Sequence, residues 1–496
     1  MDERGLTRVR TRLEDFAAGL FAGLPRSDQR GTGLRYLRGL MLDGRRKSMQ
    51  PMAQRLGVDH QQLQQFLTSS TWDVSDVRRR LARTAIDLVC PQVWVVDDTG
   101  FPKDGKASAC VARQYSGTLG KVANCQIAVS VHAASDTASA VLDWRLFVPE
   151  SWDETCVADT DGKVANPHAR RLRQQPVTRD QAGAKKPHER LRPPPAEQID
   201  QILRRRSASK LPDEQRYRPK WMMALEMLDE LAGWGLRPPL LTADAGYGQV
   251  AEFRQGLTER GIGYIVATTS STTAQSGDAQ PVEVPYAGVG MHPKPRYPQP
   301  ARSLKDLALA HGAHHARQVR WRDRIATADR APGQTSRDLA GHFLALRVRP
   351  AGRAIQRGPH CGDDGVLPEC WLLVQWPPDQ DEPTDYWLSD LPTDTLLAEL
   401  VRLAKSRWRI EHDYRELKPP SASTTSKADP GSAGTATSPS PQPPNCSSPS
   451  YDSQTQKQQG RPEPLRRPPR AAIPPRDLAR ILPTLPPTGT NLTKHY

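Results

Sequence analysis

Four acidic side chains follow or lie within segments that are predicted to be regular structure. Asp97 and Asp98 close the apolar run VWVVDD, Asp244 follows LLTA, and Glu411 lies within RWRIEHDYRELK. Carboxylates at the C-terminal ends of buried strands point into the cleft where open sheets place their sites. Each acid alone is as well explained as a turn residue or a cap. Together they have the chemistry of a two-Mg²⁺ site, in which the ions clamp the attacking and leaving oxygens of a phosphoryl displacement.

Two cations lie at helical spacing from Glu411. Arg407 precedes it by four residues and Lys418 follows it by seven, so all three share one face of a helix. This pattern indicates an acid on a metal ion, flanked by cations that contact a DNA backbone. The alternative is an ordinary ion pair between Arg407 and Glu411, worth a few tenths of a kcal/mol.

The bulk composition favours a polyanionic partner. The chain has 496 residues, a net charge of +14 and a pI near 9.6. This length predicts two or three modules, and the charge favours nucleic acid, with a solubility surplus as the alternative. The seven cysteines form no C-x-x-C pair, which excludes zinc knuckles and fits a reducing cytoplasm. Without a membrane span or a secretory signal in the sequence, a cytoplasmic protein is expected.

The N-terminal 90 residues are predicted to form a helical module that binds DNA. The segment MQPMAQRLGVDHQQLQQFLTSSTWD resembles a helix-turn-helix with its turn at Gly57. Residues 1–90 carry 16 Lys and Arg against 10 Asp and Glu, a surplus of 6. The sharpest basic cluster, Arg78, Arg79 and Arg80, is expected to contact phosphate, although a solvated face is the commoner role of such a cluster.

The rest of the chain divides by pattern. Residues 91–263 read as strands and one amphipathic helix at 219–234, interrupted by a polar, Arg- and Pro-rich insertion at 157–218 that is expected to be exposed. Residues 264–390 are β-rich and residues 391–418 return to helix. Residues 419–496 are dominated by Pro, Ser, Thr, Gln and Arg, which predicts a disordered tail.

These strings together carry a family resemblance. The segments VVDDTGFPKDGKASACVARQYSGTLGKVANCQIAVSVHA, LDWRLFVPESW, LLTADAGYG and RLAKSRWRIEHDYRELK resemble bacterial insertion-sequence DDE transposases, in the branch with a Y-x2-R-x3-E-x6-K signature. The similarity runs through residues 1–418. It implies an α/β fold with an RNase H-like mixed-sheet core, interrupted by the β-rich insertion. It also implies Mg²⁺-dependent nicking of transposon ends, with Mn²⁺ as a substitute, and strand transfer into target DNA.

The resemblance assigns the catalytic and metal-binding acids as Asp98, Asp244 and Glu411, with Asp97 as the alternative to Asp98. The implied partner is double-stranded DNA, both inverted repeats and target, in a complex with a protein homodimer at the bacterial nucleoid. A stand-alone RNase H-like nuclease and a catalytically impaired DNA-binding relic are the competing readings. The β insertion and the basic N-terminal module argue against the nuclease.

Other positions of the signature are kept in part. Arg407 and Lys418 match its Arg and Lys, whereas its Tyr falls on Ala404. Tyr115, Tyr247 and Tyr414 are the candidates to supply the missing hydroxyl, and the alternative is that no residue replaces it. Lys103 in TGFPKDGK is a candidate phosphate contact, and an ordinary loop lysine is nearly as good an explanation.

The abrupt change after Lys418 suggests a frameshift in a GC-rich gene. With GC-rich codons chosen for residues 420–439, the alternative frame encodes Trp, Phe and His in the proportions of a folded segment. The alternative is a natural disordered basic tail.

The frameshift hypothesis predicts weak activity for the chain as written. The helix that carries Glu411 needs packing neighbours, since short isolated helices are marginal in water. Misplacement of its carboxylate by about 1 Å costs roughly 100-fold in rate. Restoring the frame after Lys418 is therefore expected to raise thermal stability and Mg²⁺-dependent cleavage of transposon ends. Equal cleavage by both versions would make the tail a natural appendage.

Overall fold

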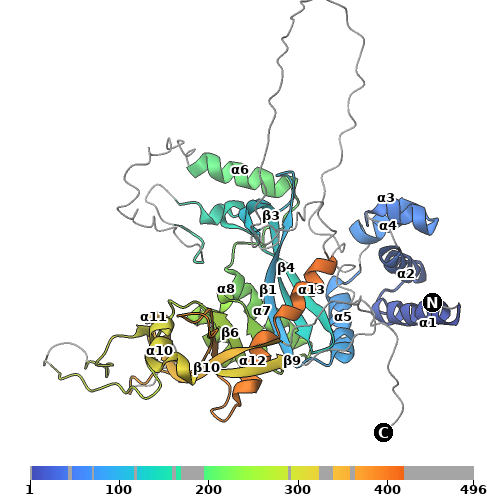
Figure 1. The fold of residues 1–496 in the computed structure, drawn as a ribbon. Helices are drawn as coiled ribbons and strands as arrows, with labels where there is room; N and C mark the ends of the chain where they lie inside the picture. Colours follow the sequence, from blue (N-terminus) through green and yellow to red (C-terminus); the bar gives the residue numbers. More distant parts are fainter. Residues whose placement is uncertain are drawn as a thin grey trace, which may run out of the picture.

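The computed structural model describes residues 3–417, apart from residues 43–46, 70–71, 117–119, 159–163, 169–194, 287, 289–291, 323–338 and 358–363. Lys418 and the predicted disordered tail, residues 419–496, lie outside the described residues. The described chain is an N-terminal group of helices beside a large mixed sheet covered by further helices (Figure 1). None of its helices is long and apolar enough to cross a membrane.

Five helices form the N-terminal module. They are α1 (Glu3–Leu20), α2 (Ser27–Met41), α3 (Met49–Leu56), α4 (His60–Thr68) and α5 (Val74–Val89). Their amphipathic faces bury a common core of aromatic and aliphatic side chains in which Phe66 contacts the rings of Phe21 and Trp72. This core is separate from those of the sheet, so the module buries its own apolar surface.

The turn between α3 and α4 has the backbone that its sequence requires. Gly57 ends α3 with φ at 64°, a left-handed conformation that favours glycine. Asp59 caps α4 by accepting a hydrogen bond from the backbone of Gln61 at 3.0 Å. Gly39 of α2 lies so close to Leu56 and Met52 that a Cβ atom there would meet the Leu56 side chain at 2.9 Å. The segment is thus a helix, a tight turn and a second helix.

The central sheet has an RNase H-like order, as expected from the sequence. Strands β4, β3 and β1 are antiparallel neighbours, and β5 and β6 continue the sheet parallel to β1, in the order β4-β3-β1-β5-β6. The bounds are β1 (Val93–Pro102), β2 (Ala112–Ser116), β3 (Lys121–Ala134), β4 (Ser139–Leu146), β5 (Leu241–Ala243) and β6 (Tyr264–Thr268).

Two hydrophobic layers cover the two faces of this sheet. One contains α5, α7 (Lys220–Gly233) and α9 (Ala251–Glu259), packed on Trp94 and Val96 of β1. The other contains α12 (Leu397–Lys405) and α13 (Trp408–Leu417), packed on Val93 and Val95. Successive residues of β1 therefore face different helices.

The β-rich insertion is continuous with the core sheet. Strand β12 pairs antiparallel with β6, so the sheet extends through β12, β11, β10, β7 and β8, with β9 also paired to β10. The bounds are β7 (Thr273–Ser276), β8 (Arg302–Ser303), α10 (Leu304–His311), β9 (Arg317–Arg322), β10 (Leu339–Pro350), α11 (Arg353–Arg357), β11 (Cys370–Gln375) and β12 (Asp385–Ser389). Because β6 pairs with β5, the core extends to Thr268, beyond the expected boundary at 264.

The segment expected to be an exposed insertion is partly built into the fold. Two short 3-10 turns, η1 (Glu150–Trp152) and η2 (Glu154–Cys156), precede it, and α6 (Pro195–Ala208) lies within it. Arg206 of α6 is 2% exposed and donates to the Trp152 carbonyl at 2.8 Å. A buried guanidinium anchors this helix against the 3-10 turns, which the polar composition did not suggest.

Helix α5 joins the N-terminal module to the sheet through Arg78. Its Nε donates to Asp143 of β4 at 3.1 Å, and its Nη2 donates to Glu230 of α7 at 2.9 Å. Arg145 donates to the same Glu230 at 2.7 Å. The Asp143 side chain is fully buried. Arg78, expected at the sequence level to contact DNA, is thus engaged inside the protein.

Removing this arginine is expected to destabilise the fold. Arg78→Ala leaves the buried Asp143 carboxylate with Arg145 at 3.7 Å, and breaking such a pair costs about 3 kcal/mol of unfolding free energy. Arg79→Ala is the control, because Arg79 pairs with Asp76 on its own helix, and exposed pairs of this kind contribute less than about 1 kcal/mol. Urea denaturation of the two variants measures both effects. Equal stabilities would show that Arg78 does not hold the module to the sheet.

Candidate active site

Two of the predicted acids lie side by side where the parallel pairing of β1 with β5 ends. Asp97 and Asp98 lie in the middle of β1, which continues to Pro102, and do not close the strand as the sequence predicted. In the β1–β5 register Val96 is opposite Ala243, so the residues that follow them, Asp97 and Asp244, are neighbours. The apolar runs that fix this register therefore also fix the separation of the two carboxylates.

The two consecutive acids of β1 point to opposite faces. Asp97 continues the row of Val93 and Val95, which packs against α12 and α13. Its cross-strand partner is Ser130, whose hydroxyl bonds to Tyr414 of α13. Asp98 continues the row of Trp94 and Val96 on the α7 side. The regular register of β1 and β3 through both residues fixes this assignment.

Asp98 has partners of its own. Lys220, the first residue of α7, donates to its Oδ2 at 2.8 Å. The Tyr247 hydroxyl donates to the same oxygen at 3.5 Å. Lys220 was not singled out from the sequence, since it lies 122 residues from its partner with no periodic pattern joining them. Tyr247, one of the three tyrosines considered, is buried beneath the acids.

Asp244 is held by the turn that follows β5. It caps the short helix α8 (Ala245–Gly248), accepting from the backbone of Tyr247 at 3.3 Å. A Cβ atom at Gly248 would lie 2.0 Å from the carbonyl oxygen of Ala267 in β6, so glycine is required there. This close approach presses α8 against β6 and fixes the direction of the Asp244 carboxylate. The capping role that was the alternative for this acid is thus real and compatible with a role at the site.

Arg407 links the helices to the acids. It lies in the two-residue turn between α12 and α13, and its Nη1 donates to Asp97 Oδ2 at 2.9 Å. Its Nη2 is 3.9 Å from Glu411 Oε1, which is the ion pair expected from the four-residue spacing. The Glu411 side chain is 59% exposed. Arg407 therefore lies between an acid of the sheet and the acid of α13.

Burial and neighbouring carboxylates raise the pKa values of two acids at the site. Burial raises the pKa of Asp97 to about 7, Arg407 opposes this rise, and Asp244 and Asp98 add to it. Burial also raises the pKa of Asp244, again opposed by Arg407 and increased by Asp98. Like charges this close favour either a shared proton or a bound cation.

A polar network docks α13 onto the sheet. The Tyr414 hydroxyl lies 2.7 Å from Ser130 Oγ and 3.3 Å from His132 Nε2, and all three residues are buried. His132 Nδ1 faces Asp413 Oδ2 at 3.6 Å, and Ser139 donates to the other Asp413 oxygen at 2.7 Å. Although serine, histidine and aspartate meet here, the serine is fully buried. The network positions the helix of Glu411 and has no access for a substrate.

A second contact fixes α12. The Lys405 ammonium lies 4.7 Å from the centroid of the Trp387 ring and 5.7 Å from those of Trp321 and Phe343. Its Nζ donates to Gln375 at 2.6 Å. Burial lowers the pKa of Lys405. Cation–π contacts with the insertion strands thus hold the helix from which Arg407 extends.

The structure places the remaining predicted residues as follows. Tyr115 is 64% exposed on β2, and Ala404 is buried in α12, so the missing signature hydroxyl has no counterpart at that position. The backbone of Lys103 pairs with Asn124 just beyond β1. Arg79 and Arg80 both pair with Asp76.

The carboxylates can be compared with a metal site. Among the described residues, no three His, Cys, Asp or Glu side chains form a ligand group for a metal ion. The charges of Asp98 and Asp244 add to the raised pKa of Asp97, and Asp98 adds to that of Asp244, whereas Glu411 is linked to these acids through Arg407. Mg²⁺ prefers oxygen ligands and binds proteins through as few as one or two carboxylates, so the neighbouring Asp97 and Asp244 have donor chemistry that fits this ion.

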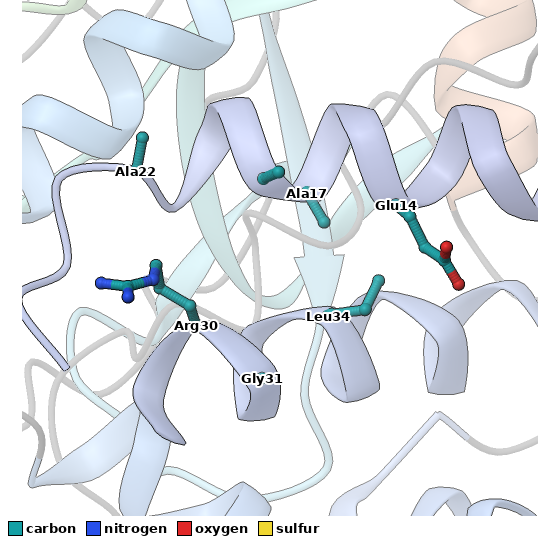
Figure 2. A pocket seen from close by; sticks show the side chains of 7 residues that line it. Glu14, Ala17, Ala22, Arg30, Gly31 and Leu34 are labelled. Carbon is teal, nitrogen blue, oxygen red and sulfur yellow. The ribbon is translucent and has the colours of Figure 1, made fainter. Parts of the chain in front are cut away.

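A groove in the N-terminal module is unrelated to these acids. It measures about 440 Å³ and lies between α1 and α2, lined by Ala17, Ala22, Gly31 and Leu34 with Glu14 and Arg30 at its edges (Figure 2). Its lining is small and mostly apolar, and none of the four acids contributes to it. The groove is present because the side chains that face each other across α1 and α2 are small.

Known proteins resemble this chain in sequence. The sequence model of a family described as "DDE superfamily endonuclease" matches residues 19–328. A protein of Microchaete diplosiphon described as "Probable transposase for insertion sequence element IS701" is 36% identical over 97 residues. That stretch covers 19% of this chain and 26% of the relative, so the chain matches about a quarter of the relative's length.

Asp97 is expected to make stability depend on pH. Its folded-state pKa of about 7 lies above the ordinary value of 3.8, because the buried carboxyl group is more stable when protonated. Asp97 therefore makes its full contribution to the free energy of unfolding below pH 3.8, and this contribution is lost as the pH rises through 7. Between pH 5 and pH 8 the parent should lose about 2–3 kcal/mol of unfolding free energy through this group. Asp97→Asn should not show this loss, because its amide does not ionise. Thermal denaturation with a chelator present measures the difference. The exposed Asp394→Asn is the control, and a pH-independent gain from Asp97→Asn would contradict the burial effect.

Proposed function

Because the chain belongs to the DDE superfamily of endonucleases, we propose that it is a transposase that cleaves the ends of an insertion sequence and joins them to target DNA. The observation that supports this is the placement of Asp97 and Asp244 beside each other, just past the last parallel pair of β1 and β5 and on the sheet face that carries α13 and Glu411. Three carboxylates that come from two strands and one helix could hold two metal ions for transfer of a phosphodiester. The similarity to a probable transposase supports the same activity.

The metal-binding role goes to Asp97, Asp244 and Glu411, with Mg²⁺ or Mn²⁺ as the ion. When bound, the ions would activate the attacking oxygen and stabilise the leaving oxygen of the phosphodiester. Asp97 is favoured over Asp98 because its side chain faces α13. Asp98 is held by Lys220 on the other face and is assigned a supporting role.

The cations of the site have two roles. Arg407 holds Asp97 and reaches toward Glu411, and its charge opposes the rise that burial causes in the pKa of Asp97. Arg407 beside the acids is proposed to contact the DNA backbone, together with Lys103 beyond the end of β1 and with Lys418. Arg79 and Arg80 are proposed as weaker phosphate contacts of the N-terminal module, because each also has a protein partner. The DNA complex is proposed to contain two copies of the chain, acting at the bacterial nucleoid.

The test is cleavage and strand transfer on duplexes that carry the inverted repeats flanking this gene, with Mg²⁺. Both the chain as written and its frame-restored version are assayed. Asp97→Asn, Asp244→Asn and Glu411→Gln are each expected to lower cleavage by roughly 100-fold or more, with DNA binding retained. Asp98→Asn should lower it less, since it removes a supporting carboxylate.

Each other outcome contradicts a specific part of the proposal. Loss of cleavage in Asp98→Asn with activity retained in Asp97→Asn would exchange the two assignments. Cleavage without strand transfer would favour the stand-alone nuclease. Binding without cleavage in both versions of the chain would favour the impaired relic.

A further inference from the structure

The exposed face of α4 consists largely of glutamine side chains. Leu63, Phe66 and Leu67 are buried against the rest of the module, whereas Gln61, Gln62, Gln64 and Gln65 are exposed. Gln61, Gln65 and the exposed Thr68 follow one another at spacings of four and three residues, so they form the centre of that face. Among the described residues, the amide groups of these glutamines have no protein partner.

The position of α4 in the fold leaves this face open. The helix packs against α2 and α3 and is reached through the tight turn at Gly57. In Figure 1, α3 and α4 lie at the periphery of the molecule, at one end of the N-terminal module above α2 and α1. The second helix of such a pair is the one that enters the major groove of DNA, with its N-terminal residues toward the base edges.

The chemistry of the face specifies a ligand. A glutamine amide carries a donor and an acceptor in the spacing of adenine N6 and N7, which it can bind through two hydrogen bonds. A neutral face contributes little attraction to phosphate, and the module's surplus of 6 positive charges supplies that long-range attraction. The methyl group of Thr68 suits contact with the thymine methyl.

We infer that α4 reads A·T base pairs in the major groove of double-stranded DNA, with Gln61 and Gln65 each bound to an adenine edge. This inference rests on the proposed function, since it names the bases by which the enzyme would find its DNA. A protein partner on the same face would require apolar anchors, whereas every residue at the centre of this face is polar.

The test begins with selection of bound duplexes from a random 20-base-pair pool by the full chain at physiological salt. The pool selected by the parent is expected to contain at least two fixed A·T pairs within one half-turn of the duplex. Replacing each fixed adenine with 7-deazaadenine, which lacks N7, should weaken binding by roughly tenfold. Gln61→Ala and Gln65→Ala should each remove the preference at one position and leave salt-dependent binding to random duplex unchanged.

Gln54→Ala is the matched control, because Gln54 is an exposed glutamine of α3, outside the proposed reading face. It should select the same sites as the parent. Equal thermal stability of all three variants excludes unfolding, as expected for exposed positions. Selection of sites unchanged by Gln61→Ala and Gln65→Ala would overturn the inference while the proposed function stands. A full chain that binds no duplex at all would overturn both.

Discussion

The register of β1 against β5 is the constraint on which the candidate site depends. Opposing Val96 to Ala243 brings the two following aspartates together, and burial then makes their charges costly. A sheet tolerates this cost because apolar side chains on both faces hold the strands in place. Arg407 pairs with Asp97 and Lys220 pairs with Asp98, so each face of the sheet has one cation for one of the two consecutive acids of β1.

The helices that bring Arg407 and Glu411 to the sheet are held by contacts far from the acids. Lys405 rests among aromatic rings of the insertion strands, and Tyr414 bonds to Ser130 of β3. The insertion thus has a structural role at the site, because its rings fix the end of α12 from which α13 departs. This support for α12 gives the extension of the core sheet a role that a smaller nuclease would not need.

Much of this arrangement was readable from the sequence, and the rest was not for physical reasons. The acids at the ends of apolar runs, the amphipathic helix now seen as α7, and the Arg407–Glu411 pair all follow from local periodicity. The faces of Asp97 and Asp98 depend on strand register, which a single sequence does not reveal. The ion pairs of Arg78 and Lys220 join residues more than 60 positions apart, and no spacing rule connects them. Strand β6 looked like part of the insertion because a short apolar run does not show whether its neighbour is parallel.

Helix α5 belongs to two cores at once. Val77 and Leu81 pack within the N-terminal module, whereas Ala85 and Val89, one to two turns later, pack under the sheet. Arg78 of the same helix also bonds to β4 and α7. Helix α5 is therefore a rigid connection between the N-terminal module, which contains α3 and α4, and the sheet that carries the acids. In the transposase proposed above, this rigid connection would fix the number of base pairs between the sequence bound by α4 and the phosphodiester at the carboxylates, which a flexible linker would leave variable.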